Sequence, residues 1–462
     1  MKLIILMNSS FGGRLRVNIK YLRYLVIILF LSPFFSFSQG EFNKWYFGEK
    51  AALDFNSGIP TALLNGIMYA SEATASVSDS TGNLLFYSDG YKVYNRNHMF
   101  MQNGYLFAST GYNQPVFPIK KIDDDSVYYI FTLGKFYAGV TQIGLFYSVL
   151  DMRLDNGLGA IVPGMKDIPV AGADDACDKL HATRHRNNRD IWIVTKKEIS
   201  YASYLISVDG ISNTPVLSPA YLYGTGVNSG ALKISQDGSK FVSCHMNDST
   251  VEFGTFNNLT GELNLLFLFR PSLPPLETRP RFAEFSSDAK VLYIEGQFLN
   301  IAEQKFYQGI CQYDATLTDS AQFMQSQILI YMSPHADQGT QGLQLGPDRK
   351  IYGNRISKDS LSVINNPGIR GTGCDFVTNA VSLNGRIAVR GLPQFLQRYK
   401  AYIHQSGRCQ GAPVSFSPDI WPPADTTLWN FGDLASGTAN TSSIAAPSHT
   451  YAAPGTYTVT LY

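Results

Sequence analysis

Two histidines spaced four residues apart are the first side chains whose types and spacing suggest chemistry. In His181-Ala-Thr-Arg-His185 the spacing is that of the zinc peptidase motif, in which a helix presents two imidazoles to one metal ion. The second position is Ala182 rather than the catalytic glutamate, and the flanking residues predict a strand that runs into a turn. On a strand, the two rings would lie on one face about 13 Å apart. We therefore expect no metal site at these histidines.

Clustered carboxylates are the second set of candidates. Asp174, Asp175 and Asp178, and separately the run Asp123–Asp125, could offer oxygen ligands to Ca²⁺, a hard cation. Neither group matches an EF-hand loop or a nonapeptide calcium repeat, so we interpret them as solvated carboxylates in turns. The expectation is no cofactor, with Ca²⁺ as the alternative.

Catalytic arrangements of other kinds have no support in the sequence. Paired acids that hydrolyse glycosides need carboxyl groups about 5–10 Å apart across a cleft, and nothing singles out a pair such as Glu284 and Glu295. The chain contains neither a G-x-S-x-G elbow nor a phosphate-binding loop. We therefore predict no catalytic residues and favour a protein that is not an enzyme.

The cysteines are spread far apart, without a C-x-x-C pair, and this spacing argues against a thiolate metal site. In an exported protein one or two disulfides can form, and the odd number of cysteines leaves one thiol over. The sequence does not assign their pairing. The five residues are Cys177, Cys244, Cys311, Cys374 and Cys409.

Aromatic residues in expected loops could form a platform on which sugars or peptides stack. The candidates are Tyr105, Phe107, Tyr112, Phe136 and Tyr137. For any single one of them, packing in the core is the more common role. The charge of the chain limits the ligand, because 37 Lys and Arg balance 36 Asp and Glu, and a net charge of +1 creates no field that attracts nucleic acid. We expect a surface protein or a polysaccharide as the partner.

The elements that would carry such sites are strands. Hydrophobic residues make up 45% and aromatic residues 13% of the chain, with 40 Gly and 22 Pro, which is typical of short strands joined by tight turns. A polar turn followed by an aromatic and β-branched run recurs about every 45 to 60 residues, the period of propeller blades. The six copies lie at 78–87, 123–131, 186–194, 235–242, 286–294 and 346–352.

This repeat predicts an all-β protein with a β-propeller over residues 41–402. One four-stranded blade cannot bury both of its faces, so several must stack around an axis. A seventh blade would combine the N-terminal strands at 43–56 with Leu392–Leu396 and close the ring; six blades, or the hairpins of a sandwich, are the alternatives. A binding site is expected at the axial mouth, where the turns converge. Pro271–Pro280 predicts an irregular loop, and we expect no amphipathic helix.

The N-terminus predicts a signal peptide over residues 1–38. Basic residues precede the apolar run 24–37, and Ser36-Phe-Ser38 offers a small-x-small cleavage site. The run has about 14 residues, short of the ~20 that a spanning helix needs, so a membrane anchor is the less favoured alternative. We predict a secreted or surface-displayed protein that begins at Gln39 or Gly40 and has no membrane span after cleavage.

Residues 407–462 carry a more specific pattern. Trp429-Asn-Phe-Gly-Asp433 is followed by Pro447-Ser-His-Thr-Tyr451 and then by Pro454-Gly-Thr-Tyr-Thr-Val-Thr-Leu461. This sequence closely resembles the PKD family of immunoglobulin-like sandwiches, whose pattern is W-x-F-G-D, then H-x-Y, then P-G-x-Y-x-V. The resemblance implies structural roles for Trp429, Phe431, Gly432, Asp433, His449, Tyr451, Pro454, Gly455 and Tyr457.

In a PKD sandwich Trp429 would fill the core, the turn after its strand would use Gly432, and Val459 would face inward on a late strand. Leu434 stands where the family usually has glycine. The late strand reaches the last residue, Tyr462, so we expect a sandwich that lacks its final strand, an unpaired edge, and a natural chain that continues.

Residues 43–400 resemble the opening of large secreted PKD-containing proteins of Bacteroidetes, which often end in a gliding-motility-associated or type IX sorting domain. The resemblance rests on runs such as Leu84–Gly90, Lys179–Ala182, Leu343–Asp348 and Gly391–Phe395. It implies an exported cell-surface or extracellular interaction or adhesion protein, with the propeller as binding scaffold and the PKD domain as spacer. The alternative is a secreted enzyme that degrades glycans or proteins, or its accessory substrate-binding module.

Overall fold

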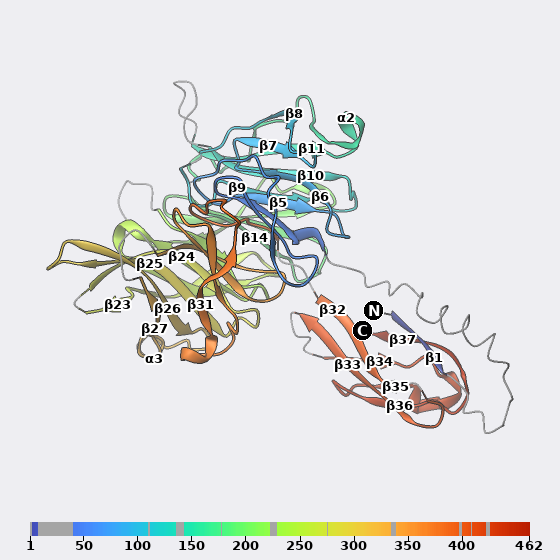
Figure 1. The fold of residues 1–462 in the computed structure, drawn as a ribbon. Coiled ribbons are helices and arrows are strands. Elements are labelled where there is room, and N and C mark those ends of the chain that lie inside the picture. The colour runs from blue at the N-terminus through green and yellow to red at the C-terminus, as the bar shows by residue number, and fades with distance from the viewer. Residues whose placement is uncertain are drawn as a thin grey trace. The chain divides into compact units, whose positions relative to one another are not determined.

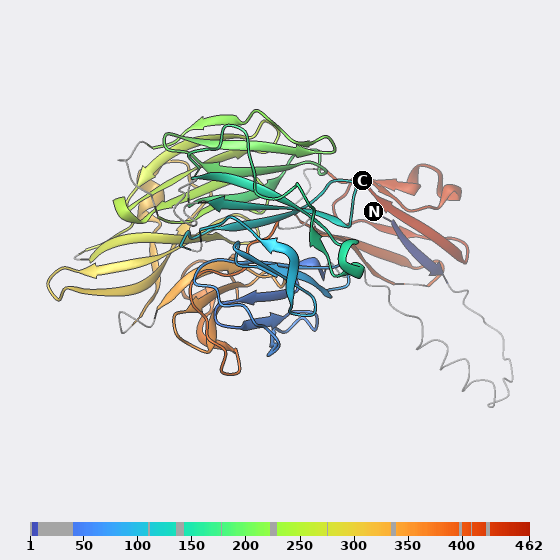
Figure 2. The same cartoon turned by 90° about the horizontal axis from the view of Figure 1, so that it is seen from above.

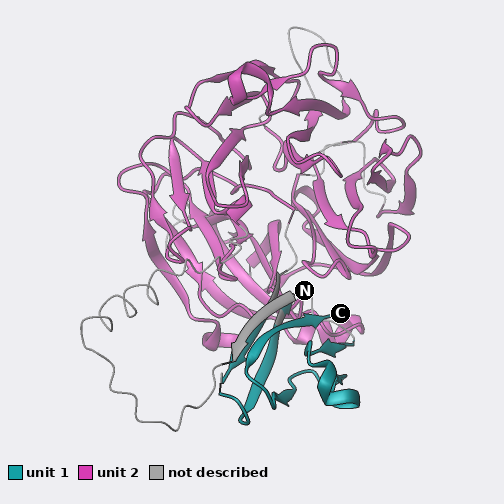
Figure 3. Cartoon of the chain, turned by 90° about the vertical axis from the view of Figure 1, so that its right-hand side faces the viewer, with its two compact units in different colours: residues 1–36, 398–462 teal, residues 37–397 magenta. Residues whose placement is uncertain are grey.

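The computed structural model describes residues 2–7, 40–109, 111–134, 143–176, 178–221, 229–274, 276–333, 339–396, 400–407, 409–421 and 426–462. The chain forms two compact units, which Figure 3 colours separately: Phe37–Gln397, and Arg398–Tyr462 together with Met1–Ser36. Both units are built mainly of strands (Figures 1 and 2). Most of the predicted signal peptide lies outside the described residues.

The larger unit is a β-propeller. In the described part of the chain its strands form seven antiparallel blades, and Figure 3 shows them around a common axis. From the innermost strand outward, blade 1 is β5 (Ala75–Ser78), β6 (Leu84–Ser88), β7 (Lys92–Asn95) and β8 (Phe100–Tyr105). Blade 2 is β9 (Val116–Lys120), β10 (Val127–Gly134), β11 (Gly144–Asp151) and β12 (Ala160–Ile161), with β13 (Ile168–Pro169). Blade 3 is β14 (Leu180–Arg184), β15 (Ile191–Lys196) and β16 (Ser200–Ser207), with β17 (Gly210–Ile211) and β18 (Val216–Pro219).

The remaining blades follow the same order. Blade 4 is β19 (Leu232–Ile234), β20 (Lys240–His245), β21 (Thr250–Asn257) and β22 (Glu262–Phe269); blade 5 is β24 (Leu276–Phe285), β25 (Val291–Asn300), β26 (Lys305–Asp314) and β27 (Ile328–Met332), with β23 (Ser272–Leu273); blade 6 is β28 (Thr340–Leu345), β29 (Ile351–Arg355), β30 (Ser360–Ile364) and β31 (Phe376–Ser382); blade 7 is β2 (Lys44–Phe47), β3 (Ala51–Asp54) and β4 (Thr61–Ala62). Parallel pairing of β8 with β12 joins blades 1 and 2 at their outer edges.

The repeated polar turns connect the first and second strands of the blades. In blade 4 the run Ser235–Ser239 closes the turn between β19 and β20, and the carboxylate of Asp237 accepts the backbone N–H of Ser239 at 3.1 Å. Gly238 adopts a left-handed φ of +65°, which glycine adopts at little steric cost. This turn chemistry is the reason that the repeat is visible in the sequence.

Blade 7 is closed by both ends of the unit. Leu392–Leu396, from the C-terminal end, packs against the N-terminal strands β2 and β3. The ring of Phe395 stacks on Phe42 with centroids 4.6 Å apart and lies 6.0 Å from Trp45. The backbone N–H of Gln394 also donates to the carbonyl oxygen of the residue before β5 at 2.7 Å. The structure therefore has the seven blades and the shared closure that the sequence predicts.

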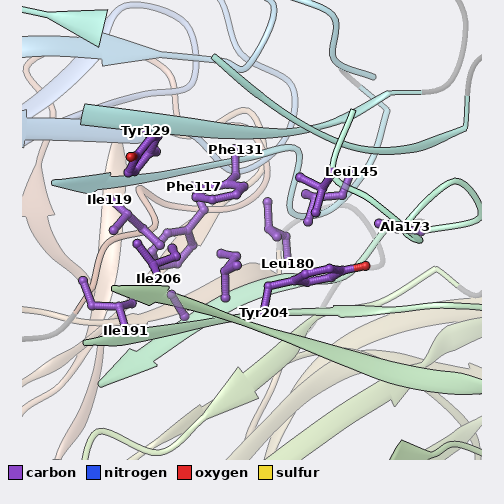
Figure 4. Packing of buried hydrophobic residues seen from close by; sticks show 14 of the residues in the cluster. Phe117, Ile119, Tyr129, Phe131, Leu145, Ala173, Leu180, Ile191, Tyr204 and Ile206 are labelled. Carbon is purple, nitrogen blue, oxygen red and sulfur yellow. The ribbon is translucent and has the colours of Figure 1, made fainter. Parts of the chain in front are cut away.

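Apolar clusters fill the spaces between neighbouring blades. Figure 4 shows the cluster between blades 2 and 3, where Phe117 and Phe131 face Leu180 and Tyr204. Strand β10 is buried at every position, as expected of a strand that is covered on both faces. Full burial of one such side chain contributes roughly 1.5–3 kcal/mol, so these clusters hold the blades together.

The smaller unit is a β-sandwich. One sheet has the order β1-β37-β34-β35 and the other β32-β33-β36. The bounds are β1 (Lys2–Met7), β32 (Lys400–Ser406), β33 (Pro413–Trp421), β34 (Trp429–Asn430), β35 (Thr441–Ser442), β36 (Ser448–Thr450) and β37 (Gly455–Leu461). Because β32 pairs with β33 along its whole length, the units divide between Gln397 and Arg398, a few residues before the predicted boundary at 402–407.

The edge of β37 differs from the sequence-based expectation of an unpaired strand. In the structure β1 pairs antiparallel with β37, with Lys2 opposite Thr460 and Met7 opposite Gly455. The backbone groups of β37 on this side are therefore bonded within the unit. The strand that bonds them belongs to the predicted signal peptide.

One further expectation is wrong. Pro271–Pro280 is not an irregular loop, because β23 and the first five residues of β24 lie within it. The pairing of β24 with β25 shifts register between Pro280 and Phe282, and a bulge accommodates a residue that has no N–H to donate. Short helices also occur. They are α2 (Leu154–Gly157), α3 (Ser320–Gln325), and the 3-10 helices η1 (Gly40–Phe42), η2 (Met246–Asp248), η3 (Gly371–Cys374) and η4 (Leu434–Asn440).

Candidate functional site

The structure separates the two histidines of the zinc-like motif. His181 lies on β14 and is buried, and this burial, with Lys233 as a second cause, lowers its pKa well below the usual range. His185 lies beyond the end of β14, where its Nε2 is 3.0 Å from the carbonyl oxygen of Leu259. Among the residues that the structure describes, no group of three or more His, Cys, Asp or Glu is arranged to hold a metal ion.

The predicted acidic clusters contact donors of the protein itself. Asp178 is buried and accepts the backbone N–H groups of Asn113 and Gly230 at 2.6 and 2.8 Å. These contacts fix the loops that lead into blades 2, 3 and 4. The other carboxylates form ion pairs: Asp174 and Asp175 with Lys197, Asp123 with Arg189, Asp124 with Arg153, and Asp125 with Lys120.

Glu284, on β24, and Glu295, on β25, are both buried. Glu284 accepts Lys233 Nζ at 2.9 Å and the backbone N–H of Leu345 at 3.0 Å. Within the described part of the chain, neither carboxyl oxygen of Glu295 has a hydrogen-bond partner. Burial raises the pKa of Glu295 well above the usual range, although the nearby guanidinium of Arg281 opposes the shift.

The described cysteines are free thiols. Cys244, Cys311 and Cys374 are buried, and Cys409 is exposed. Burial raises the pKa of Cys244 and of Cys311 to about 12, so these two thiols are poor nucleophiles. Cys177 lies outside the described residues.

Two of the candidate aromatic residues meet at the surface. Tyr105 and Phe107 line a cavity of about 390 Å³ together with Tyr91. Tyr112 is only 2% exposed and packs in the core between blades 2 and 3, which is the more common role for such a residue. Phe136 and Tyr137 lie outside the described residues.

A second cavity, of about 360 Å³, also has Tyr91 as a wall. Because the two cavities share this residue, we describe them as one site, the Tyr91 groove. Tyr69 is 63% exposed and Tyr105 is 49% exposed, so the groove offers flat aromatic faces to solvent. The groove is lined by Glu49, Tyr69, Glu72, Asp89, Tyr91, Lys92, Pro115 and Val389 on one side and by Tyr105, Leu106, Phe107, Lys166 and Asp167 on the other, with three small residues at 70, 71 and 73.

The turn between β6 and β7 positions Tyr91. The carboxylate of Asp89 accepts the backbone N–H groups of Tyr91 at 3.0 Å and Lys92 at 2.6 Å, and Gly90 has a φ of +89°. The ring of Tyr91 meets Tyr105, the last residue of β8, nearly edge-on with centroids 5.9 Å apart. Both residues lie on the same face of the propeller, because successive strands of a blade alternate in direction.

The buried carboxylates of the groove already have donors. Asp89 is held by its turn, and Asp167 accepts the backbone N–H of Phe107 at 2.8 Å. Glu72 accepts Arg281 Nη2 with both oxygens at 3.1 Å and Arg390 Nη1 at 3.2 Å. Burial raises the pKa of all three carboxyl groups above the usual range, although these donors oppose the shift. These groups therefore stabilise the walls of the groove.

At the inner end of the groove, Arg281 connects three blades. It projects from β24 of blade 5, and its Nε donates to Asn113, before blade 2, at 2.6 Å. Its Nη2 reaches Glu72, before blade 1. Arg390 also donates to Gln341, near the start of β28 in blade 6, at 3.1 Å. The ends of the innermost strands are thus linked by one network of charged and amide groups.

Sequence reasoning missed most of this groove. The sequence analysis did not single out Tyr91, although an Asp-Gly turn with a tyrosine directly after it signals an aromatic residue held at a surface turn. Tyr69, Glu72 and Arg281 carry no local signal, because the fold of the ring alone brings them together.

The PKD motif residues form the core of the smaller unit. Trp429, Phe431 and Tyr451 are buried, and their cluster includes Val414, Phe416, Val459 and Leu461. The Tyr451 hydroxyl donates to the carbonyl oxygen of Phe431 at 3.0 Å. Gly432 has a φ of +71°, and a Cβ atom at this position would collide with the backbone of Thr458.

His449 and Asp433 form a buried pair, with Nε2 and Oδ2 3.0 Å apart. Phe431 stacks on the imidazole of His449 with centroids 4.5 Å apart. Pro454 is exposed, and Gly455 begins β37. Tyr457 is half-buried, and its hydroxyl donates to a backbone carbonyl at 2.9 Å. These contacts give the motif residues structural roles.

Comparison with known proteins identifies one part of the chain. Residues 406–462 match the PKD domain family, so the smaller unit contains a PKD domain. No curated protein matches the chain. Within the described ranges, none of the helices has the length and apolar character needed to cross a membrane.

Several solved structures are similar to the chain. The periplasmic gluconolactonase PpgL of Pseudomonas aeruginosa is 11% identical, with a TM-score of 0.44, and the match covers 76% of this chain and 98% of that chain. The Dos1 propeller is 11% identical, with a TM-score of 0.41 and coverage of 82% and 90%. The Cps50 (Swd1) β-propeller domain of Myceliophteria thermophila is 11% identical, with a TM-score of 0.39 and coverage of 69% and 94%.

Proposed function

We propose that the protein is an exported adhesion protein of the kind found among secreted PKD-containing proteins of Bacteroidetes, and that its propeller binds a polysaccharide in the Tyr91 groove. The observation that carries the proposal is the shared wall of the groove, because two cavities of about 360 and 390 Å³ both contact Tyr91. PKD domains are typical of extracellular proteins, which supports a spacer role for the smaller unit.

The chemistry of the groove suits a sugar chain. Tyr69, Tyr91 and Tyr105 offer flat rings with a polar hydroxyl at one end, and such rings pack against the C–H faces of sugars while the hydroxyl bonds to water or ligand. Each cavity falls in the size range of small-ligand sites, about 300–1,000 Å³. Two adjoining cavities with one shared aromatic wall accommodate consecutive units of a chain.

Binding of soluble polysaccharides tests the proposal. Affinity electrophoresis or calorimetry is run with wild type, Tyr91→Ala and Tyr307→Ala, where Tyr307 is a half-buried tyrosine outside the groove. We expect Tyr91→Ala to weaken binding at least tenfold, about 1.4 kcal/mol, because it removes the wall of both cavities. Tyr307→Ala is expected to bind like wild type.

Thermal unfolding of each variant confirms that the propeller is intact. Equal binding by wild type and Tyr91→Ala would place the ligand elsewhere and contradict the proposal. Release of new reducing ends during the incubation would replace it with the alternative of a glycan-degrading enzyme.

A further inference from the structure

Three lysine ammonium groups at the Tyr91 groove form no ion pair with any residue that the structure describes. Lys92 and Lys166 line its two cavities, and Lys50 Nζ lies 5.0 Å from the ring centroid of Tyr69. None of the carboxylates in the described residues forms an ion pair with these three groups. By contrast, Lys44, on the neighbouring strand β2, pairs with Asp54 at 3.1 Å.

Aromatic rings hold two of these lysines in place. Lys92 Nζ lies 5.8 Å from the ring centroid of Tyr91 and 5.4 Å from that of Phe100, and its side chain is half-buried. The methylene stem of such a lysine packs on apolar surface while the ammonium group stays accessible, and the ring faces attract the cation. Lys50 has the same relation to Tyr69. An incoming anion therefore meets cations that are already positioned.

The acidic side of the groove offers much less to a cationic ligand. Asp89, Asp167 and Glu72 accept backbone N–H groups or guanidinium groups of the protein. Glu49 is the remaining acid of the lining, and it is exposed to solvent. A cation entering the groove would have to displace internal donors. An anion instead finds three ammonium groups that form no ion pair within the described residues, although Asp89 lies near Lys92 and Asp167 lies near Lys166.

We infer that the ligand of the Tyr91 groove is an acidic polysaccharide, a sugar chain that carries carboxylate or sulfate groups. The inference rests on the proposed function, because the tyrosines supply the stacking surface and the lysines add the selectivity for charge. An ammonium group contacts a carboxylate or a sulfate as a point charge, so both anionic groups suit the lysines. The uncharged sugar faces stack on Tyr91 and Tyr105.

The test compares polymers that differ in charge. Dissociation constants are measured for dextran, polygalacturonate and dextran sulfate with wild type, with the double variant Lys92→Met and Lys166→Met, and with Lys305→Met. Lys305 is an exposed lysine of blade 5 outside the groove. We expect wild type to bind at least one acidic polymer tenfold or more tightly than dextran, and the double variant to reduce this preference below about threefold. Methionine keeps the stem, so only the charge is removed.

Salt dependence and Lys305→Met separate specific from general attraction. Raising NaCl from 50 to 300 mM should reduce the acidic preference of wild type and leave dextran binding nearly unchanged. A loss with Lys305→Met equal to that of the double variant would overturn the inference, because any surface lysine would then suffice. Preference for polygalacturonate identifies the anionic group as carboxylate and preference for dextran sulfate as sulfate; either result supports the inference.

Failure of the inference is distinguishable from failure of the proposed function. If wild type binds all three polymers equally and Tyr91→Ala loses all of them, the groove binds carbohydrate without selecting charge. The acidic inference is then wrong and the proposed function stands. If wild type binds no polymer, both are wrong.

Discussion

Removal of the Arg281 side chain should destabilise the propeller strongly. This side chain is 11% exposed and donates to both oxygens of Glu72, which is 5% exposed, and to Asn113. In Arg281→Met the carboxylate of Glu72 would keep only Arg390, and the amide oxygen of Asn113 would lose its donor. The segments that lead into blades 1 and 2 would lose their link to strand β24 of blade 5.

The size of the effect follows from burial. Removing one partner of a buried ion pair costs about 3–5 kcal/mol, because the other charge remains in a poorly solvated site. The side chain of Arg390 contacts the same carboxylate but is 42% exposed, so solvent screens its charge and Arg390→Met should cost less than about 1 kcal/mol. The contrast between the two variants therefore tests the role of burial, with the acceptor held constant.

Urea unfolding followed by circular dichroism measures both costs, with the transitions of the two units fitted separately. Arg281→Met should shift only the propeller transition. Its loss of unfolding free energy relative to wild type should become smaller as the pH is lowered, because protonation of Glu72 removes the uncompensated charge. A loss below 1 kcal/mol for Arg281→Met, or equal losses for the two variants, would refute the reasoning.

Two further predictions concern buried side chains. Trp429 is fully buried in the sandwich, so Trp429→Ala should lower the unfolding free energy of that unit by about 3–5 kcal/mol. Limited proteolysis should then cut after about Lys400 and leave a stable fragment of roughly residues 41–400. Loss of that fragment would mean that the two units share one core. Burial, with Lys179 as a second cause, lowers the pKa of His245 from 6.5 to about 4, so its neutral form adds stability that is present above pH 6.5 and lost as the pH falls towards 4. Between pH 7 and 4.5 wild type should lose about 2 kcal/mol more unfolding free energy than His245→Gln, and equal losses would contradict the shift.

The parts of the fold that were predicted correctly depend on short-range chemistry. The turn at Asp237-Gly238 needs a residue that adopts a left-handed φ and a carboxylate that accepts a nearby N–H, and two adjacent residues meet both requirements. The PKD motif is equally local, since Gly432 follows the strand of Trp429 and must lack a Cβ atom. Such positions tolerate few residue types, so they can be recognised in a sequence.

The parts that were missed depend on distant residues. Pro280 argued against a strand, and only the bulge in the pairing of β24 with β25 makes it acceptable there. Arg281 and Glu72 are 209 residues apart in sequence, and no local pattern relates them. The Tyr91 groove likewise combines residues of blades 1, 2 and 7, which become neighbours only when the ring has closed.

The closure of blade 7 also sets the order in which the chain can reach its native state during synthesis. Arg386 Nη2 donates to the carbonyl oxygen of Leu64 across 322 residues. The stacking contact of Phe42 can form only after Phe395 has been synthesised. Contacts of such long sequence separation form slowly, because the entropy of the intervening loop opposes them. The apolar faces between blades 6 and 7 stay open to aggregation until then. We expect nascent chains shorter than about 390 residues to depend on chaperones, and the completed propeller to form only after the ribosome has released its last strand.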